Sequence, residues 1–91
     1  MMKVVKLNRR FKQYKEHGHT IALKFSHGHT SDSVAIEKVC RTRLNDNGWL
    51  PSHTWYSYYG DRPRRLAARP FWITFRNEAD LTLVMLSAKI N

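Results

Sequence analysis

The sequence contains a single cysteine, Cys40, among its 91 residues. One thiol excludes a disulfide bond within the chain and fits a reducing compartment. Long apolar runs are also missing, because charged and polar residues interrupt the N-terminal hydrophobic stretch from Lys6 onward. No run approaches the length of a membrane span. We therefore expect a cytoplasmic protein without a signal sequence.

Acidic residues are scarce as well. Seven Asp and Glu stand against sixteen Lys and Arg, which gives a formal net charge of +9. This excess favours polyanions, nucleic acid first and then an anionic membrane surface or an acidic protein, although some proteins are basic merely for solubility. Apolar residues make up 42% of the chain, which is enough for a core, so we expect one domain over residues 1–91.

Catalytic motifs are absent from the sequence. It has no pair of carboxylates at a convincing spacing, no nucleophile elbow, no phosphate-binding glycine loop and no telling Cys–His arrangement. Histidine and arginine together can cleave RNA by acid–base chemistry, and His27, His29 and His53 are the candidates for that alternative. We expect a protein that is not an enzyme and that needs no cofactor.

Histidines form two His-x-His pairs, in residues 17–19 and 27–29. Each pair can chelate Zn²⁺ or Cu²⁺ if its backbone is extended. The pairs lie at opposite ends of a predicted strand, however, about 25–30 Å apart by the rise per residue. We therefore expect loop histidines that are partly charged near neutral pH, and no metal site.

The stretch of residues 69–81 constrains the fold most. Over residues 71–75, phenylalanine and isoleucine alternate with Trp72 and Thr74, and this period of two predicts a half-buried strand with Trp72 on its exposed face. Asn77 then offers a side-chain cap, and acids followed by an apolar run predict a helix.

Hydrophobic patterns elsewhere predict three more strands and one more helix. Residues 8–16 are either an amphipathic connector that packs Phe11 and Tyr14 on the core, or a short helix with these rings and several cations on one face. We expect an α+β fold, in which an antiparallel sheet of about four strands has two helices packed on one face. The strands are expected at residues 2–7, 19–26, 54–59 and 71–75, and the helices at residues 31–45 and 78–90.

The helix over residues 31–45 has Ser31 or Asp32 as its expected N-cap. Its apolar stripe includes Cys40, so we expect the thiol in the core rather than in solvent. Gly48 follows a polar run and is the natural left-handed terminator.

The segment of residues 78–90 is too apolar for an ordinary surface helix. At about 100° per residue it carries two apolar stripes on opposite sides, of which only one can cover the sheet. The other needs a second cover, either from residues 8–16 or from another copy of the chain, and self-association is the simplest form of a protein partner. If residues 81–86 instead continue as strand, the second stripe disappears. The first stripe is Leu81, Val84, Met85 and Ala88, and the second is Ala79, Leu83, Leu86 and Ile90.

The expected order of elements is β-β-α-β-β-α. From the second strand onward it is the order of a ferredoxin-like or split βαβ domain without its final strand, and residues 2–7 are available for that edge. Within this order, residues 69–81 resemble the third strand and second helix of an RNA-recognition motif, where a strand ending in Thr-Phe runs into a helix opened by Asn-Glu-x-Asp. The resemblance implies that Phe71 and Ile73 are buried and that Trp72 stacks on a base.

The chain departs from that motif at three places. Pro70 stands where a second stacking ring is expected, and the glycine of the motif is missing. The outward residues of the strand at 19–26 are Thr20, Ala22 and Lys24, whereas the motif has an aromatic residue there.

These observations predict a small nucleic-acid-binding protein, for RNA or DNA, whose lysines and arginines hold phosphates and whose exposed rings stack on bases. The arginine-rich loop of residues 60–69 is either a phosphate clamp or a solvated hairpin tip, and the scarcity of acids favours the clamp. If about six phosphates are neutralised, affinity should fall about a thousandfold between about 50 and 200 mM salt. The expected binding residues are Arg9, Arg10, Lys12, Lys15, Tyr56, Tyr58, Arg62, Arg64, Arg65, Arg69 and Trp72.

The alternative is an adaptor or inhibitor that docks on an acidic protein through the same basic loop. In this interpretation Leu83, Leu86 and Ile90 form a homodimer interface. Small size, positive charge and the lack of catalytic residues are typical of phage accessory proteins of that kind. Neither interpretation involves a membrane.

Overall fold

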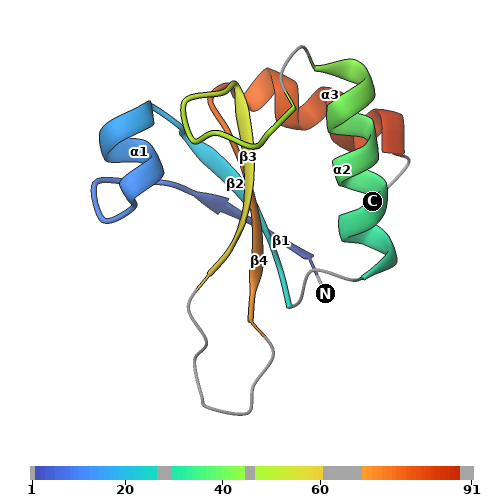
Figure 1. Cartoon of the computed structure of the whole chain (residues 1–91), viewed down its shortest axis with the longest axis horizontal. Helices are drawn as coiled ribbons and strands as arrows, with labels where there is room; N and C mark the ends of the chain where they lie inside the picture. Colours follow the sequence, from blue (N-terminus) through green and yellow to red (C-terminus); the bar gives the residue numbers. More distant parts are fainter. Residues whose placement is uncertain (1, 27–29, 45–46, 61–68, 89–91) are drawn as a thin grey trace.

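The structure is a computed structural model that describes residues 2–26, 30–44, 47–60 and 69–88 (Figure 1). It has four strands and three helices in these ranges. In chain order they are β1 (Met2–Lys6), α1 (Lys12–His17), β2 (Ile21–Phe25), α2 (Ser31–Arg43), β3 (Trp55–Tyr59), β4 (Phe71–Phe75) and α3 (Glu78–Ala88).

The four strands form one sheet in the order β1-β2-β4-β3, and every neighbouring pair is antiparallel. Strands β2 and β3 therefore run in the same direction, with β4 between them and α2 as their connection. The predicted α+β class and the four-stranded antiparallel sheet are confirmed. The N-terminal strand takes the edge beside β2 for which residues 2–7 were the expected source.

Alternation along β2 and β4 gives the sheet one dry face. Cross-strand pairing places Leu23 opposite Ile73 and Phe25 opposite Phe71, and all four side chains are buried. Apolar side chains from two helices and from β3 close this layer, because a sheet with one apolar face must bury it against another element. The buried core is Ile21, Leu23, Phe25, Ile36, Cys40, Trp55, Phe71, Ile73, Phe75, Leu81 and Val84.

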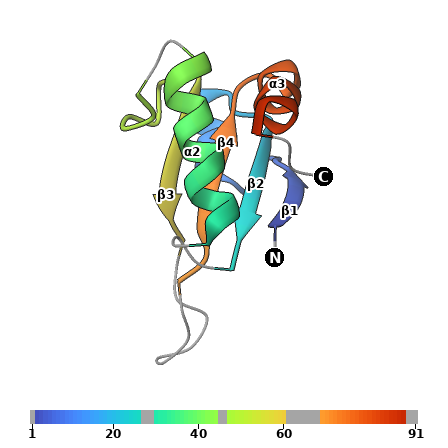
Figure 2. The same cartoon turned by 90° about the vertical axis from the view of Figure 1, so that its right-hand side faces the viewer.

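Two helices cover the dry face and one lies across from them. In Figure 2, α2 and α3 lie side by side in front of the sheet. Figure 1 shows α1 on the opposite side. The prediction of two helices on one face holds for α2 and α3, but α1 is a third helix. It begins at Lys12 and ends at His17. Gly18 caps it, with a left-handed φ of 71° and an N–H that donates to the carbonyl oxygen of Tyr14.

The N-cap of helix α2 lies one residue before the first of the two predicted cap residues. The hydroxyl of Thr30 accepts the N–H of Ser33 at 3.0 Å, and the hydroxyl of Ser33 donates to the carbonyl oxygen of Thr30 at 2.9 Å. Thr30 is therefore the N-cap, and Ser31 and Asp32 lie in the first turn. Cys40 is fully buried, as predicted, and its burial raises the pKa of the thiol to about 12.

Helix α3 confirms the two predicted stripes as far as it is described. Leu81 and Val84 are buried in the core, and Met85 and Ala88 pack against it. Leu83 and Leu86 lie on the other side and are 43% and 73% exposed. The alternative of a strand over residues 81–86 is wrong. No helix in the described ranges is both long and apolar enough to cross a bilayer.

Candidate functional site

The face of the sheet opposite α2 and α3 carries the candidate site. Pairing in direct register places Lys3 opposite Lys24, Lys24 opposite Trp72, and Trp72 opposite Tyr58. One residue from each strand thus forms a line across the whole sheet, which we call the cation–ring row. Because directly opposed residues share a face, all four side chains belong to this side of the sheet. Two cations occupy the β1–β2 half of the row and two rings occupy the β4–β3 half.

The rings of this face form a continuous aromatic surface. Tyr58 and Trp72 lie nearly parallel, with ring centroids 6.3 Å apart and 7° between their planes. Tyr56 continues the series and stacks on Tyr58 at 5.3 Å. Phe11 is the residue before α1, and its ring lies edge-on to that of Trp72 with the ring centroids 5.8 Å apart. The ammonium group of Lys24 lies 5.3 Å from the centre of the Trp72 ring, within the range of a cation–π contact.

Trp72 is neither sunk in the core nor free in solvent. Its neighbours on β4, Phe71 and Ile73, are buried beneath the sheet, while the indole is partly exposed on the other face. Gly60 approaches it so closely that a Cβ there would lie 2.7 Å from the indole nitrogen. The ring is therefore held in one orientation by Phe11, Tyr58 and Gly60, with part of its surface open. Such an arrangement suits a stacking platform, since a fixed ring loses little entropy when a base binds.

Tyr58 is also partly buried. Burial, with a smaller contribution from Tyr56, raises the pKa of its phenol to about 12. The phenol is therefore neutral at physiological pH, and the aromatic surface carries no negative charge that would repel phosphates.

The other half of this face is covered. Ala22 and Thr74 lie next to the cation–ring row on the same face, yet both are fully buried. The segment that leads from α1 into β2 lies there, and His19 from this segment contacts Thr74. The accessible part of the face is consequently the half that holds Lys3, Lys24, Trp72 and Tyr58, with the partly buried Tyr56 at its border.

His19 belongs to this cover. Its Nε2 lies 2.8 Å from the carbonyl oxygen of His53 and its Nδ1 lies 2.7 Å from the hydroxyl of Thr74. A carbonyl only accepts, so Nε2 carries the proton and Nδ1 accepts the Thr74 hydroxyl. Burial lowers the pKa of His19 below its ordinary 6.5, and the nearby positive charges of Arg76 and His17 act in the same direction. His19 is thus a buried neutral residue, not the partly charged loop histidine that we predicted.

We expect the stability of the fold to fall at mildly acidic pH because of His19. Its folded-state pKa is depressed, so this contribution is fully present above about pH 6.5 and is lost as the pH falls from there toward the folded-state pKa. The slope is at most about 1.4 kcal/mol per pH unit. Urea unfolding from about pH 5 to pH 7 measures it. His19→Gln should be less stable at neutral pH and flatter in its pH profile. Parallel profiles for wild type and His19→Gln would contradict the assignment.

The remaining histidines do not form a ligand cluster in what the structure describes. Within these ranges no three His, Cys, Asp or Glu side chains are placed to hold a metal ion. The pair at residues 27–29 lies outside the described residues. The Nδ1 atom of His53 is buried and has no hydrogen-bond partner among the described residues.

Four predicted cations lie on the α1 side of the molecule. Arg9 and Arg10 are in the turn before α1, Lys12 and Lys15 are on the helix itself, and all four are exposed. In the described part of the chain, the single ion pair joins Arg41 to Glu37 on α2. These four positive charges are therefore not neutralised by any described carboxylate.

Arg69 is held near the end of the β3–β4 connection, just before β4. Its Nε donates to the carbonyl oxygen of Gly60 at 3.1 Å, and its guanidinium group lies 5.8 Å from the ring centre of Tyr59. The prediction of a phosphate clamp at Arg62, Arg64 and Arg65 falls outside the described residues.

Lys3 and Lys24 are the site residues that sequence reasoning missed. The alternation in β2 did place Lys24 outward, but it gave no reason to connect that residue with Lys3 or with Trp72. The signal that joins them is cross-strand register, which depends on which strands pair. The proposed partner interface is likewise only partly described, because Leu83 and Leu86 are exposed on α3 while Ile90 lies beyond the described part of the helix.

No family model, curated protein or solved structure matches the chain.

Proposed function

We propose that the chain is a small single-domain nucleic-acid-binding protein that uses the open face of its sheet. The cation–ring row is the observation that carries this proposal. Two lysines and two parallel rings in one line offer contacts for phosphates and for bases within a single surface. Aromatic side chains stack on bases that are splayed out of a duplex. Single-stranded RNA or DNA is therefore the expected ligand.

The arrangement of the strands supports a ferredoxin-like architecture for this function. Strand β4 lies between β2 and β3, which α2 connects, and this is the split βαβ arrangement. Strand β1 then occupies the edge that the last strand of such a domain would take. Sheets of this kind in RNA-recognition motifs stack two or three bases on their open face, and Trp72, Tyr58 and Tyr56 offer a comparable number of rings. Fold alone does not carry function, so the row remains the basis of the proposal.

Trp72→Ala tests the stacking part of the proposal. One stacked base contributes about 1–3 kcal/mol, so we expect an affinity about 5- to 150-fold weaker for a single-stranded oligonucleotide. Fluorescence anisotropy with a labelled 12-mer measures this change. Trp49→Ala is the matched control, because Trp49 is 72% exposed in the loop before β3 and should not contribute.

A second variant separates stacking from folding. Trp72→Phe keeps a ring on β4 and should restore most of the affinity, with circular dichroism confirming that both variants fold. If a folded Trp72→Ala binds as tightly as Trp49→Ala, the rings do not stack on bases.

A second candidate, an adaptor that dimerises through α3, is favoured by the exposure of Leu83 and Leu86. Large apolar side chains exposed together on one helix are typical of an interaction surface. Leu83→Asp with Leu86→Asp should convert a dimer to a monomer in analytical ultracentrifugation, while Val34→Asp, a change at an exposed apolar residue of α2, should not. A monomeric mass for the wild-type chain at all concentrations would exclude the dimer.

A further inference from the structure

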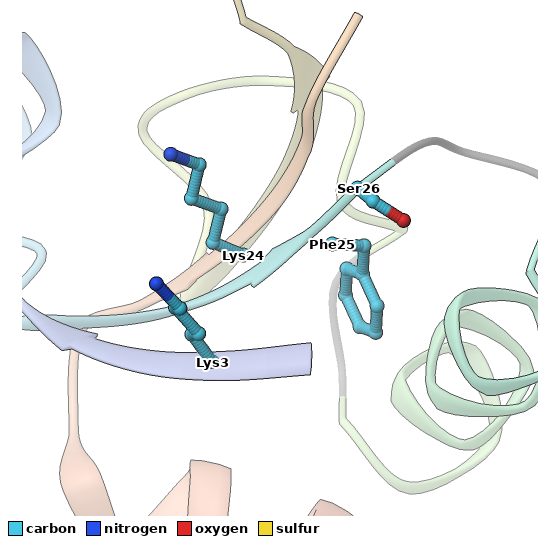
Figure 3. A pocket seen from close by; sticks show the side chains of 4 residues that line it. All are labelled: Lys3, Lys24, Phe25 and Ser26. Atoms are coloured by element: carbon cyan, nitrogen blue, oxygen red, sulfur yellow. The ribbon is translucent and has the colours of Figure 1, made fainter. Parts of the chain in front are cut away.

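The β1 end of the cation–ring row is a pocket. Lys3, Lys24, Phe25 and Ser26 line it, at the position where β1 begins and β2 ends (Figure 3). Figure 3 shows the two lysine side chains extending to the same side of the sheet, while the ring of Phe25 points to the other side, into the core. The polar groups on the accessible side of this pocket are thus two ammonium groups, with the exposed Ser26 at its rim.

The two lysines are an unfavourable pair in the protein alone. They are directly opposed on adjacent antiparallel strands, where side chains start about 5 Å apart and like charges destabilise the sheet. No described carboxylate forms an ion pair with either lysine, since the one ion pair of the described residues is on α2. Lys24 gains some compensation from the Trp72 ring, but no described contact compensates Lys3. A bound anion removes the repulsion between them.

The neighbouring ring indicates which anion fits. Trp72 is the next residue of the row after Lys24, so an anion midway between the lysines lies one and a half strand spacings, roughly 7 Å, from the strand that carries the ring. A nucleotide carries a flat base and a phosphate at a short separation of this kind. A carboxylate peptide or a small inorganic anion would use the lysines but would leave the ring without a role.

We propose that the Lys3–Lys24 pocket binds the backbone phosphate of the nucleotide whose base stacks on Trp72. The site rests on the proposed nucleic-acid function and deepens it in one respect: it fixes the course of the strand. Phosphate contacts position a nucleic acid on its protein. A phosphate at the β1 edge and bases on β4 and β3 direct the strand across the sheet, roughly perpendicular to the β-strands.

Lys3→Gln tests the site, with Lys38→Gln as the matched control. Lys38 is exposed on α2, on the other side of the sheet, and the substitution removes the same charge. A charge-assisted contact to phosphate is worth about tenfold in affinity, so Lys3→Gln should bind a single-stranded tetranucleotide about tenfold more weakly than Lys38→Gln. Its thermal midpoint should be equal to or higher than that of the wild type, because a like-charge pair is removed.

Oligonucleotides with one uncharged methylphosphonate linkage locate the phosphate. Scanning that linkage along the tetranucleotide should reveal one position that weakens binding to the wild-type chain about tenfold, and Lys3→Gln should no longer be sensitive at that position.

A titration with inorganic phosphate at matched ionic strength is the second test. If inorganic phosphate alone shifts the Ser26 amide resonance while Lys3→Gln leaves oligonucleotide binding unchanged, the pocket binds free phosphate and the proposal fails. Equal binding by Lys3→Gln and Lys38→Gln overturns this site and leaves the nucleic-acid function standing. Failure of the wild-type chain to bind any oligonucleotide overturns both.

Discussion

Raising the salt concentration from about 50 to 200 mM should weaken the binding of a single-stranded oligonucleotide by about 300-fold. Each neutralised phosphate of a single strand contributes about −0.7 to the slope of log affinity against log salt, and a duplex about −0.9. With about six phosphates, a fourfold change in salt gives about 300-fold for a single strand and about a thousandfold for a duplex. Seven described cations lie on the cation–ring row, on α1 and the turn before it, or just before β4: Lys3, Arg9, Arg10, Lys12, Lys15, Lys24 and Arg69.

The same titration separates the two candidate functions. Fluorescence anisotropy at several salt concentrations gives the slope, and Lys12→Gln, which removes one exposed cation of α1, should reduce it by about 0.7 if Lys12 contacts a phosphate. A slope near zero would exclude binding through the phosphate backbone. A pulldown with and without nuclease adds a second criterion, because an acidic protein partner survives the treatment whereas partners bridged by nucleic acid do not.

The sheet could be predicted because its information is local. Alternation with a period of two over residues 71–75 fixes which side chains face the core, whatever the strand pairs with. The same alternation places Trp72 on the opposite face. Helix α3 followed from the apolar spacing of its residues, and its exposed leucines followed from the same spacing.

The elements that were misjudged depend on contacts between distant residues. The sequence placed Phe11 and Tyr14 together, but in the structure Phe11 packs on Trp72 while Tyr14 is 39% exposed. His19 was taken for a loop histidine because its partners, Thr74 and His53, are far away along the chain. Its buried state can be inferred only after the strands have been paired.

The site combines both kinds of information. Trp72 was predicted from the alternation within its own strand, and Tyr58 from the aromatic composition of residues 54–59. Lys3 was not, because its meaning comes from a β1–β2 pairing in one particular register. A shift of one residue would turn Lys3 to the helix side and remove the row. The cation–ring row is thus a property of the assembled sheet, and its four members could be listed only once the order β1-β2-β4-β3 was known.

The loop that joins α2 to β3 also supports the aromatic surface. Gly48 has a φ of 77°, and its carbonyl oxygen accepts the N–H of Ser57 at 3.2 Å, on the outer edge of β3. This contact satisfies an edge N–H that would otherwise be available for pairing with another chain. Ser57 lies between Tyr56 and Tyr58, so the loop holds the part of β3 that presents both rings.

Gly48→Ala should therefore be one of the most destabilising single substitutions in the chain. A Cβ at this position would overlap the ring of Trp55, which is fully buried in the core and has no room to move aside. The left-handed backbone costs about 1–2 kcal/mol for alanine, and overpacking adds about 1–3 kcal/mol. The sum is about 2–5 kcal/mol. Because the free energy of unfolding of a native protein is typically about 5–15 kcal/mol, a loss at the upper end of this sum would remove a large part of the stability. Chemical denaturation followed by circular dichroism measures the loss.

Gly18→Ala isolates the overlap from the backbone cost. Gly18 has nearly the same φ, 71°, but a Cβ there meets nothing within 4 Å. Both variants carry the left-handed penalty, so the difference between them reports the collision with Trp55 and should lower the melting temperature of Gly48→Ala by about 4–8 °C per kcal/mol relative to Gly18→Ala. Equal losses in the two variants would mean that Trp55 or the loop moves away without cost. In that case β3 would not be held rigidly by the loop, and the fixed orientation of Tyr56 and Tyr58 on the open face would lose its structural basis.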